Sequence, residues 1–310
     1  MSSLISIIIP TYNRAHLICE TITSIQKQSY TNWECIIVDD ASTDNTEYVI
    51  SKYLESDSRI SFYKKPECLP KGPSASRNYG FTKSSGTYIN WFDSDDLMHP
   101  KKLEIDLKQI TTGDFDFTIS QSDFFKDNGT PKRKYWNKAI WSLDPINDFI
   151  ISDIGWGVNS PLWVRNSLEV KNLVFNEELM TADDYLYHIQ ALEFGFKPVI
   201  LEQVLVCQRE HKERLNDYVF KSPSKLLVNY YLIKNKEKLK LNNNSVNFLK
   251  IQFYGHFNYL LKHRDLKLAF YYLKRFGLYG YNQKQKMNLY RNVLIGVLYK
   301  VSGYGYRYLK

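Results

Sequence analysis

The sequence predicts an α/β protein, with a mostly parallel sheet flanked by helices and a helical C-terminal region after it. Within residues 4–210, short apolar runs of strand length alternate with segments of helical periodicity. This alternation is typical of parallel strands joined by right-handed helical crossovers. From Ser222 onward, periodic apolar and aromatic positions with interleaved lysines predict helices without further strands.

Each element follows from its local pattern. The run Leu4–Ile9 is apolar and β-branched and is stopped by Pro10, as expected for a buried strand. Residues 15–28 place their apolar side chains at helical spacing, and residues 40–45 are rich in N-cap residue types that open a second helix. An Asp-Asn-Gly sequence at 127–129 predicts a hairpin or flap. The predicted strands are 4–9, 33–38, 60–64, 88–92, 115–120 and 198–206, and the predicted helices are 15–28, 40–54, 75–82, 100–110 and 181–194.

Length and charge divide the chain into two regions. Its 310 residues can form one large domain or a core domain with an appendage. We predict an α/β domain over 1–215, with halves at 1–98 and 99–215, and a basic, aromatic-rich helical region over 216–310. Residues 211–310 hold 20 Lys and Arg but four acids. This region should therefore meet an anionic partner.

Targeting and membrane-spanning segments are not predicted. The start of the chain lacks the basic n-region of a signal peptide, and no run of about 18 apolar residues occurs. The four cysteines are scattered without metal-ligand spacing, which indicates free thiols in a reducing compartment. The sequence therefore predicts a cytoplasmic protein.

Three carboxylates follow the predicted strand at 88–92. Asp93, Asp95 and Asp96 would repel one another unless a positive charge lies among them. Magnesium prefers oxygen ligands and typically takes one or two carboxylates plus substrate phosphates. The carboxyl end of a strand is also where open α/β sheets bind ligands. The alternative is a surface turn that caps the following helix.

The loop after the first strand excludes two common phosphate sites. Residues 10–14 contain no glycine, although a dinucleotide-binding fold needs a glycine-rich turn there, and no Walker loop occurs. Phosphates must therefore be neutralised in another way, and a cation held by the carboxylates fits. Asp40, after the second strand, would lie on the same sheet edge and accept from a base N–H or a ribose hydroxyl. Tyr12 either stacks on the base or is simply packed.

The ordered blocks at residues 7–14, 36–44, 75–78, 86–89 and 93–96 resemble the family 2 glycosyltransferases, which include bacterial enzymes of capsule, lipopolysaccharide and surface-polysaccharide synthesis. The resemblance covers residues 4–210. It implies a GT-A fold, a nucleotide-sugar donor that is most often a UDP-sugar, and inversion at the anomeric centre. It also implies Mg²⁺ or Mn²⁺ as the cofactor.

The resemblance implies a role for each matched residue. Asp40 would bind a ring N–H of the base, and Arg77 would lie near the base or the diphosphate. Asp95 would ligate the metal that bridges the phosphates, with Asp93 on ribose or metal. The implied nucleotide-sugar-binding residues are Pro10, Tyr12, Asp40, Arg77, Asp93, Asp95 and Asp183, and the implied metal ligands are Asp95, Asp93 and His211.

The resemblance places the general base at Asp184. The family has a Glu-Asp pair at this point, so Asp183 replaces the usual Glu. Processive members carry a Gln/Arg-rich tryptophan motif downstream, which is missing at residues 190–193. A hexosyl- or N-acetylhexosaminyltransferase that adds one sugar per encounter is therefore expected. His211 falls in an Arg-x-His sequence seen after the last strand in some members.

Each implied role has a structural alternative. Asp40 also suits a helix N-cap. Asp184 would be the acid of a capping box that begins at Thr181. Arg77 would lie on a helix surface, and His211 in an ordinary loop.

The basic C-terminal region indicates where the acceptor is found. Cations interleaved with aromatic residues suit an anionic membrane surface. We therefore predict a peripheral enzyme on the inner face of the cytoplasmic membrane, acting on a saccharide or polyprenyl-linked saccharide. The alternatives are an ordinary helical subdomain with a solvated lysine-rich face, a nucleic-acid-binding protein without a recognised motif, and a catalytically silent sugar-nucleotide-binding partner.

Overall fold

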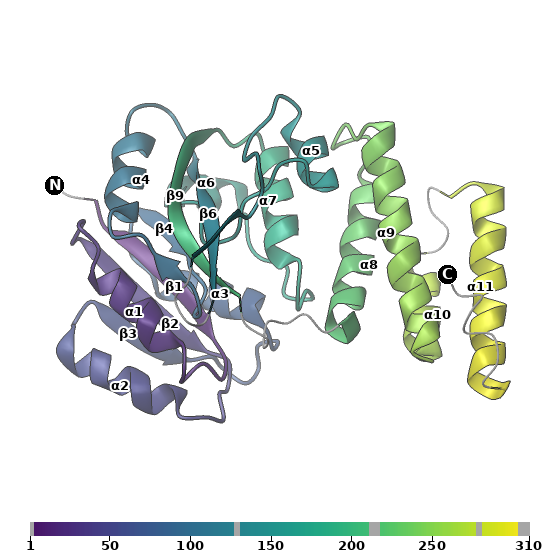
Figure 1. Ribbon diagram of the computed structural model, residues 1–310, viewed down its shortest axis with the longest axis horizontal. Helices are drawn as coiled ribbons and strands as arrows, with labels where there is room; N and C mark the ends of the chain where they lie inside the picture. Colours follow the sequence, from purple (N-terminus) through teal and green to yellow (C-terminus); the bar gives the residue numbers. More distant parts are fainter. Residues whose placement is uncertain (1–2, 127–130, 211–217, 277–280, 303–310) are drawn as a thin grey trace. The chain divides into compact units, whose positions relative to one another are not determined.

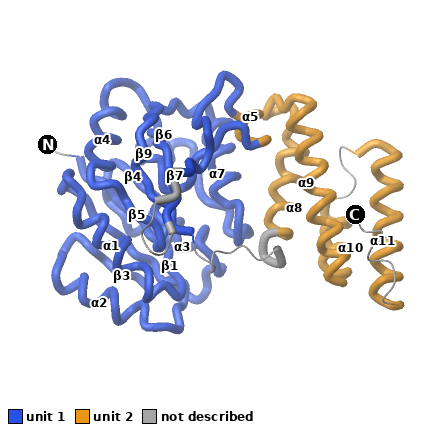
Figure 2. Tube along the Cα trace, in the orientation of Figure 1, with its two compact units in different colours: residues 1–145, 152–214 blue, residues 146–151, 215–310 orange. Residues whose placement is uncertain are grey.

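The chain forms two compact units in the computed structural model, which describes residues 3–126, 131–210, 218–276 and 281–302 (Figures 1 and 2). The first unit comprises residues 1–145 and 152–214, and the second comprises 146–151 and 215–310. The first is built on a nine-stranded sheet, and the second is helical. In the part of the chain that is described, no helix combines the length and the apolar character needed to cross a bilayer.

The sheet of the first unit has the order β3-β2-β1-β4-β8-β6-β9-β5, with β7 paired to β6. Its strands are β1 (Ile5–Thr11), β2 (Trp33–Asp39), β3 (Ile60–Lys64), β4 (Tyr88–Trp91), β5 (Leu97–Met98), β6 (Phe117–Lys126), β7 (Pro131–Tyr135), β8 (Trp163–Val164) and β9 (Pro198–Glu210). The strands β3, β2, β1 and β4 are all parallel to one another. The short strand β8 is antiparallel to both of its neighbours, and β5 is antiparallel to β9. The predicted fold class is confirmed, and the sheet is mixed because β5, β7 and β8 run against the strands with which they pair.

The helices cover the sheet of the first unit and make up the second unit. They are α1 (Ile18–Gln26), α2 (Thr46–Ser56), α3 (Pro73–Lys83), α4 (Lys102–Ile110), α5 (Pro145–Ile151), α6 (Arg165–Lys171), α7 (Asp183–Glu193), α8 (Tyr218–Lys234), α9 (Asn243–Lys262), α10 (Leu266–Phe276) and α11 (Gln283–Ser302). The second unit has its own apolar core, formed by side chains such as Leu226, Phe257, Tyr272 and Leu289. The turn predicted at 127–129 lies outside the described residues, although β6 and β7 on either side of it pair antiparallel.

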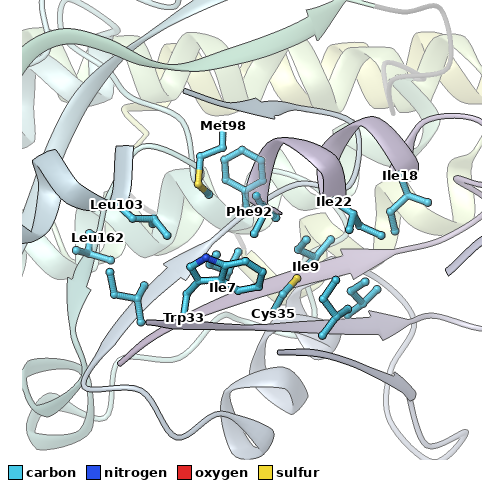
Figure 3. Packing of buried hydrophobic residues seen from close by; sticks show 14 of the residues in the cluster. Ile7, Ile9, Ile18, Ile22, Trp33, Cys35, Phe92, Met98, Leu103 and Leu162 are labelled. Carbon is cyan, nitrogen blue, oxygen red and sulfur yellow. The ribbon is translucent and has the colours of Figure 1, made fainter. Parts of the chain in front are cut away.

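The core of the first unit follows from the period-two pattern of a strand. Ile7 and Ile9 of β1 point to one face of the sheet, where they pack with Ile18 and Ile22 of α1 and with Leu103 of α4 (Figure 3). All five side chains are completely buried. The continuous apolar run predicted a strand buried on both faces, and the opposite face of β1 is indeed covered by α3.

Helix α3 approaches this opposite face so closely that Gly80 has no room for a side chain. A Cβ at Gly80 would lie 2.4 Å from Ile8 Cγ2 and 3.2 Å from Val38 Cγ2. We expect Gly80→Ala to lower the free energy of unfolding by about 1–3 kcal/mol, because overpacking forces side chains and backbone to shift. Urea denaturation followed by circular dichroism measures this change.

Gly255 provides the matched control for Gly80. It lies within α9, and a Cβ there would meet no atom within 4 Å. Gly255→Ala should therefore raise the free energy of unfolding by about 0.5–1 kcal/mol, since alanine has less backbone freedom to lose. Equal changes at both positions would contradict the close approach of α3 to β1.

Candidate functional site

The loops after β1 and β2 meet at the carboxyl edge of the sheet and are tied to each other. Parallel pairing sets Thr11 at the end of β1 beside Asp39 at the end of β2. The backbone N–H of Asn13 donates to Ser42 Oγ at 2.8 Å, and the Thr43 N–H donates to Asn13 Oδ1 at 2.8 Å. These bonds fix the loop that carries Tyr12, whose side chain is 52% exposed. The edge therefore offers an accessible aromatic ring beside an ordered backbone. Pro10 lies within β1, two residues before Tyr12.

Asp40 is held by two groups that the sequence did not reveal. Its Oδ2 accepts from the Gly72 N–H at 2.6 Å, and its Oδ1 pairs with Lys65 Nζ. The only local signal for Lys65 is its position directly after β3, the next parallel strand. The helix-cap alternative is wrong, because α2 begins at Thr46 with Asn45 as its N-cap. Asp40 is therefore oriented by a cation and a backbone amide at the sheet edge.

The carboxylates after β4 form a cluster that suits a hard cation. Asp93, Asp95 and Asp96 can each offer one oxygen, and these oxygens lie within 4.8 Å of one another. Asp95 Oδ2 lies 3.7 Å from Arg14 Nε. The alternative of a capping turn is wrong, because α4 begins at Lys102 without a side-chain cap. The donor set, made only of carboxylate oxygens, fits Mg²⁺ or Mn²⁺.

Asp96 is a structural member of this cluster. Its side chain is fully buried, with Oδ1 accepting from the Arg209 N–H at 2.8 Å and Oδ2 accepting from Asn159 Nδ2 at 2.6 Å. Asn159 Oδ1 in turn accepts from the Asp93 N–H at 2.9 Å. Asp96 therefore fixes the turn, and Asp93 and Asp95 are the candidate metal ligands.

Arg209 also fixes the carboxylate turn through its side chain. Arg209 Nε donates to the Asp95 carbonyl at 3.0 Å, its Nη2 pairs with Glu20 Oε2 at 2.7 Å, and its guanidinium stacks over Phe125 at 4.6 Å. Its side chain is 2% exposed. The Arg-x-His sequence singled out this segment for its histidine, but His211 lies outside the described residues. Within the described residues, Arg209 is the member of this sequence that contacts the carboxylate turn.

A buried lysine anchors the loop that carries Asn159. Lys102 Nζ donates to Asp106 Oδ2 at 2.5 Å and to the Ser160 carbonyl at 2.6 Å. Both side chains of the ion pair are completely buried, and Asp106 Oδ1 accepts from Thr118 Oγ1 at 2.8 Å. Since buried charges require such partners, this network fixes the loop. No sequence motif had indicated Asn159 or Lys102.

Arg77 joins the carboxylate turn to the start of α7. Its Nη2 donates to Asp93 Oδ1 at 2.7 Å, and its Nη1 donates to Asp183 Oδ2 at 2.6 Å. The guanidinium lies 5.1 Å from the ring centre of Phe175. The surface-helix alternative is wrong, because Arg77 is 4% exposed. Two segments separated by about ninety residues of chain are therefore linked through one cation.

The ionisation of Arg77 and Asp183 depends on their burial and on the charges around them. Burial lowers the pKa of Arg77, but the carboxylates of Asp183, Asp93 and Asp184 outweigh it and raise that pKa. Burial also raises the pKa of Asp183, and the Arg77 guanidinium acts in the opposite direction. Ser74 Oγ donates to Asp183 Oδ2 at 3.2 Å. On balance the surroundings favour the charged form of Arg77, whereas burial outweighs the contacts with Arg77 and Ser74 and leaves the pKa of Asp183 above its usual value.

Asp184 is the second residue of α7. The capping-box alternative required Thr181 at the N-cap, but the helix begins at Asp183 and its N-cap is Ala182, which has a φ of 59° and makes no side-chain capping bond. Asp184 therefore lies in the first turn of α7, and Thr181 lies before the N-cap. The positive end of the helix dipole favours the ionised carboxylate there, and Asp184 is close enough to Arg77 to raise its pKa.

His188, one turn further along α7, is not an acid–base group. It is packed among aromatic rings. Its imidazole is nearly parallel to the Trp163 ring, with 6.0 Å between the ring centres, and tilted against the Trp156 ring, with 5.4 Å between the ring centres. Burial lowers the pKa of His188 to about 3, so its imidazole is neutral at physiological pH. The predicted site residues that are described fall into two groups. The first lies around the carboxylate turn and the start of α7 and comprises Arg77, Asp93, Asp95, Asp183 and Asp184. The second lies at the adjoining strand ends and comprises Pro10, Tyr12 and Asp40.

The parallel β3-β2-β1-β4 half, the mixed second half and the carboxylates at the strand ends together define a glycosyltransferase fold of the GT-A type. The family model described as "Glycosyl transferase family 2" matches residues 6–164. The chain belongs to this family. The resemblance to enzymes of bacterial surface polysaccharide synthesis is confirmed by its relatives.

One relative is the Escherichia coli protein named UDP-Glc:alpha-D-GlcNAc-diphosphoundecaprenol beta-1,3-glucosyltransferase WfgD, which is 33% identical over 143 residues and 44% of this chain. Another, from Bacillus subtilis, is named putative teichuronic acid biosynthesis glycosyltransferase TuaG and is 34% identical over 132 residues and 43% of this chain. The matched segments make up 55% of WfgD, 52% of TuaG and 18% of a longer relative from Rickettsia bellii, so the chain spans only part of these relatives.

The fold is similar to that of a solved structure, S. aureus TarS in complex with UDP. The TM-score is 0.60 and the sequence identity is 18%, over 96% of this chain and 82% of the TarS chain. At this identity the likeness concerns the fold alone. It extends beyond the segment matched by the family model.

Proposed function

We propose that this protein is an inverting, metal-dependent and non-processive glycosyltransferase that moves a sugar from a UDP-sugar to a hydroxyl of a lipid-linked saccharide. The reaction would take place at the inner face of the cytoplasmic membrane during surface polysaccharide assembly. The names of WfgD and TuaG support a lipid-linked acceptor and a surface polysaccharide, and the UDP complex of TarS supports the nucleotide. The first compact unit would carry both the donor and the acceptor sites.

The observation that carries the proposal is the double ion pair of Arg77. It links Asp93, in the candidate donor turn, to Asp183, which precedes the candidate base Asp184. A transferase must hold its donor and its base in a fixed relation, because orientation alone contributes several kcal/mol to catalysis. A buried arginine with two carboxylate partners provides such rigidity.

The proposed chemistry is a single in-line displacement. Asp184 accepts the proton of the acceptor hydroxyl while that oxygen forms a bond to the anomeric carbon. The bond from the anomeric carbon to the diphosphate oxygen breaks on the opposite face, and its electron pair leaves with UDP. One displacement without a protein nucleophile inverts the anomeric configuration.

The donor is proposed to lie along the strand ends. Asp40 would accept from an N–H of the base, since Lys65 and Gly72 already orient its carboxylate. Tyr12 offers an exposed ring for stacking. Asp93 and Asp95 would hold the divalent cation, which when bound neutralises charge on the diphosphate leaving group.

Metal removal tests the donor site. In the presence of Mn²⁺ or Mg²⁺, UDP at about 100 times its Kd should raise the free energy of unfolding of the wild-type protein by about 2.7 kcal/mol. A chelator should remove most of this effect, because UDP would then bind without its metal. Thermal unfolding with each of UDP, GDP and dTDP measures it. Asp95→Asn should lose the metal-dependent part, whereas Asp153→Asn, at an exposed loop position, should retain it.

Two results would contradict the proposed donor site. UDP stabilisation that is the same with chelator and with Mn²⁺ would exclude a metal bridge to the phosphates. Equal stabilisation by all three nucleotides would contradict the assignment of uracil as the nucleobase of the donor. Nuclear magnetic resonance of the product formed from an undecaprenyl-diphosphate-linked acceptor then reports the anomeric configuration directly.

A further inference from the structure

Helix α11 uses one face to pack within the second unit. Leu289, Asn292 and Gly296 are buried on this face. Asn292 Nδ2 donates to Asn258 Oδ1 of α9 at 2.9 Å, and a Cβ at Gly296 would lie 3.0 Å from Leu261 Cδ2. The small residue and the polar bond bring α11 close to α9 and fix its rotation. The opposite face of α11 is thereby directed away from the helix that holds it.

This opposite face carries a stripe of exposed apolar side chains. Its members recur at spacings of three and four residues, so they share one side of the helix over about 21 Å. They are Met287 (70% exposed), Tyr290 (55%), Leu294 (65%), Leu298 (62%) and Val301 (83%). Scattered apolar residues on a surface are ordinary, but a continuous stripe of large ones indicates an interaction site.

The charge around the stripe has a single sign. Helices α10 and α11 contain seven Lys and Arg and no Asp or Glu. At the helical period, Lys284 and Arg291 run along one edge of the stripe. Helix α10 adds two half-exposed rings, Phe270 and Tyr271 (46% and 48% exposed). Apolar and aromatic side chains bordered by cations are typical of helices that lie in the interface of an anionic bilayer.

We propose that the α11 stripe is the surface by which the protein docks on an anionic lipid bilayer, with Leu294 and Leu298 at its centre. The inference rests on the proposed function and deepens it by assigning membrane contact to one face of one helix. Charge favours this occupant over a second copy of the chain. Pairing two copies through this face would bring two sets of cations together without a compensating acid, whereas anionic headgroups complement them.

Vesicle sedimentation of the full chain tests the proposal without donor or acceptor. Wild-type protein should bind vesicles containing phosphatidylglycerol and not vesicles of phosphatidylcholine alone, with weaker binding at high salt. The double variant Leu294→Gln/Leu298→Gln should lower the partition coefficient by roughly 100-fold. Lys284→Gln/Arg291→Gln should weaken binding mainly at low salt. Val170→Gln, at an equally exposed position of α6 (71% exposed), should have no effect.

Several outcomes would overturn the proposal. The proposal is wrong if the wild-type protein does not bind the anionic vesicles. It is also wrong if the leucine double variant binds them as well as the wild type does. Light scattering that reveals a dimer lost only in that variant would assign the stripe to a second copy of the chain. Salt-sensitive RNA retention stronger than vesicle binding would assign it to nucleic acid.

A parallel measurement separates this inference from the proposed function. UDP binding in the presence of Mn²⁺ should be unchanged in the leucine double variant, since neither residue belongs to the donor site. Loss of vesicle binding with intact UDP binding therefore reports on the stripe alone. Thermal unfolding of each variant verifies that these exposed substitutions leave the protein folded.

Discussion

Replacing Asp184 by asparagine is expected to lower kcat by roughly 10³-fold, within the usual contribution of a general base. Asparagine occupies the same space but cannot accept the proton of the acceptor hydroxyl. UDP affinity should change little, because the candidate contacts to the nucleotide come from the strand ends rather than from this residue. Steady-state transfer rates and isothermal titration with UDP measure the two quantities separately.

The control for Asp184 is Asp153→Asn, which makes the same chemical change at an exposed position of the same unit and should retain full activity. An Asp184→Asn enzyme with wild-type turnover would refute the assignment of the base. A variant that loses UDP affinity as severely as turnover would instead indicate that Asp184 organises the donor site.

Replacing Arg77 by methionine should lower the free energy of unfolding by about 3–5 kcal/mol, because it leaves the buried carboxylate of Asp183 without its cation. Asp183 is 6% exposed and Asp93 is also deprived of its ion pair. Transfer activity should fall together with stability, since the link between the carboxylate turn and α7 is lost. Urea denaturation gives the change in stability.

A double-mutant cycle distinguishes the ion pair from simple loss of packing. Asp183→Asn removes the uncompensated charge, so Arg77→Met/Asp183→Asn should be more stable than Arg77→Met alone. Lys197→Met, which breaks the exposed ion pair with Asp114, should leave stability unchanged. Strictly additive effects in the Arg77 and Asp183 cycle would show that the two side chains do not interact.

Much of the candidate site was predictable because it lies at the ends of parallel strands. The runs that form β1, β2 and β4 are recognisable from apolar and β-branched residues alone. Parallel pairing then brings their carboxyl ends to one edge, which places Tyr12, Asp40 and Asp93 near each other without any knowledge of side-chain contacts. The same logic predicted the class of fold.

The structural alternatives show where local patterns mislead. Asp40 and Asp184 both match helix-capping sequences, yet the N-caps of α2 and α7 are Asn45 and Ala182. Asp40 is bound instead by Lys65 and the Gly72 N–H, which come from later segments of the chain. Capping propensity is a local preference of about 1 kcal/mol, so a tertiary ion pair readily overrides it.

The sequence by itself determined the α/β class, the strand ends that carry the carboxylates and the basic helical C-terminal region, because these depend on residue type and short-range periodicity. Only the tertiary structure decided that Arg77 bridges Asp93 and Asp183, that Arg209 fixes the turn around Asp96, and that β8 is antiparallel to both of its neighbours. It also decided which side of α11 is exposed. The physical reason is that each of these contacts joins residues far apart in the chain, and their pairing depends on burial and charge neutralisation in three dimensions rather than on any local pattern.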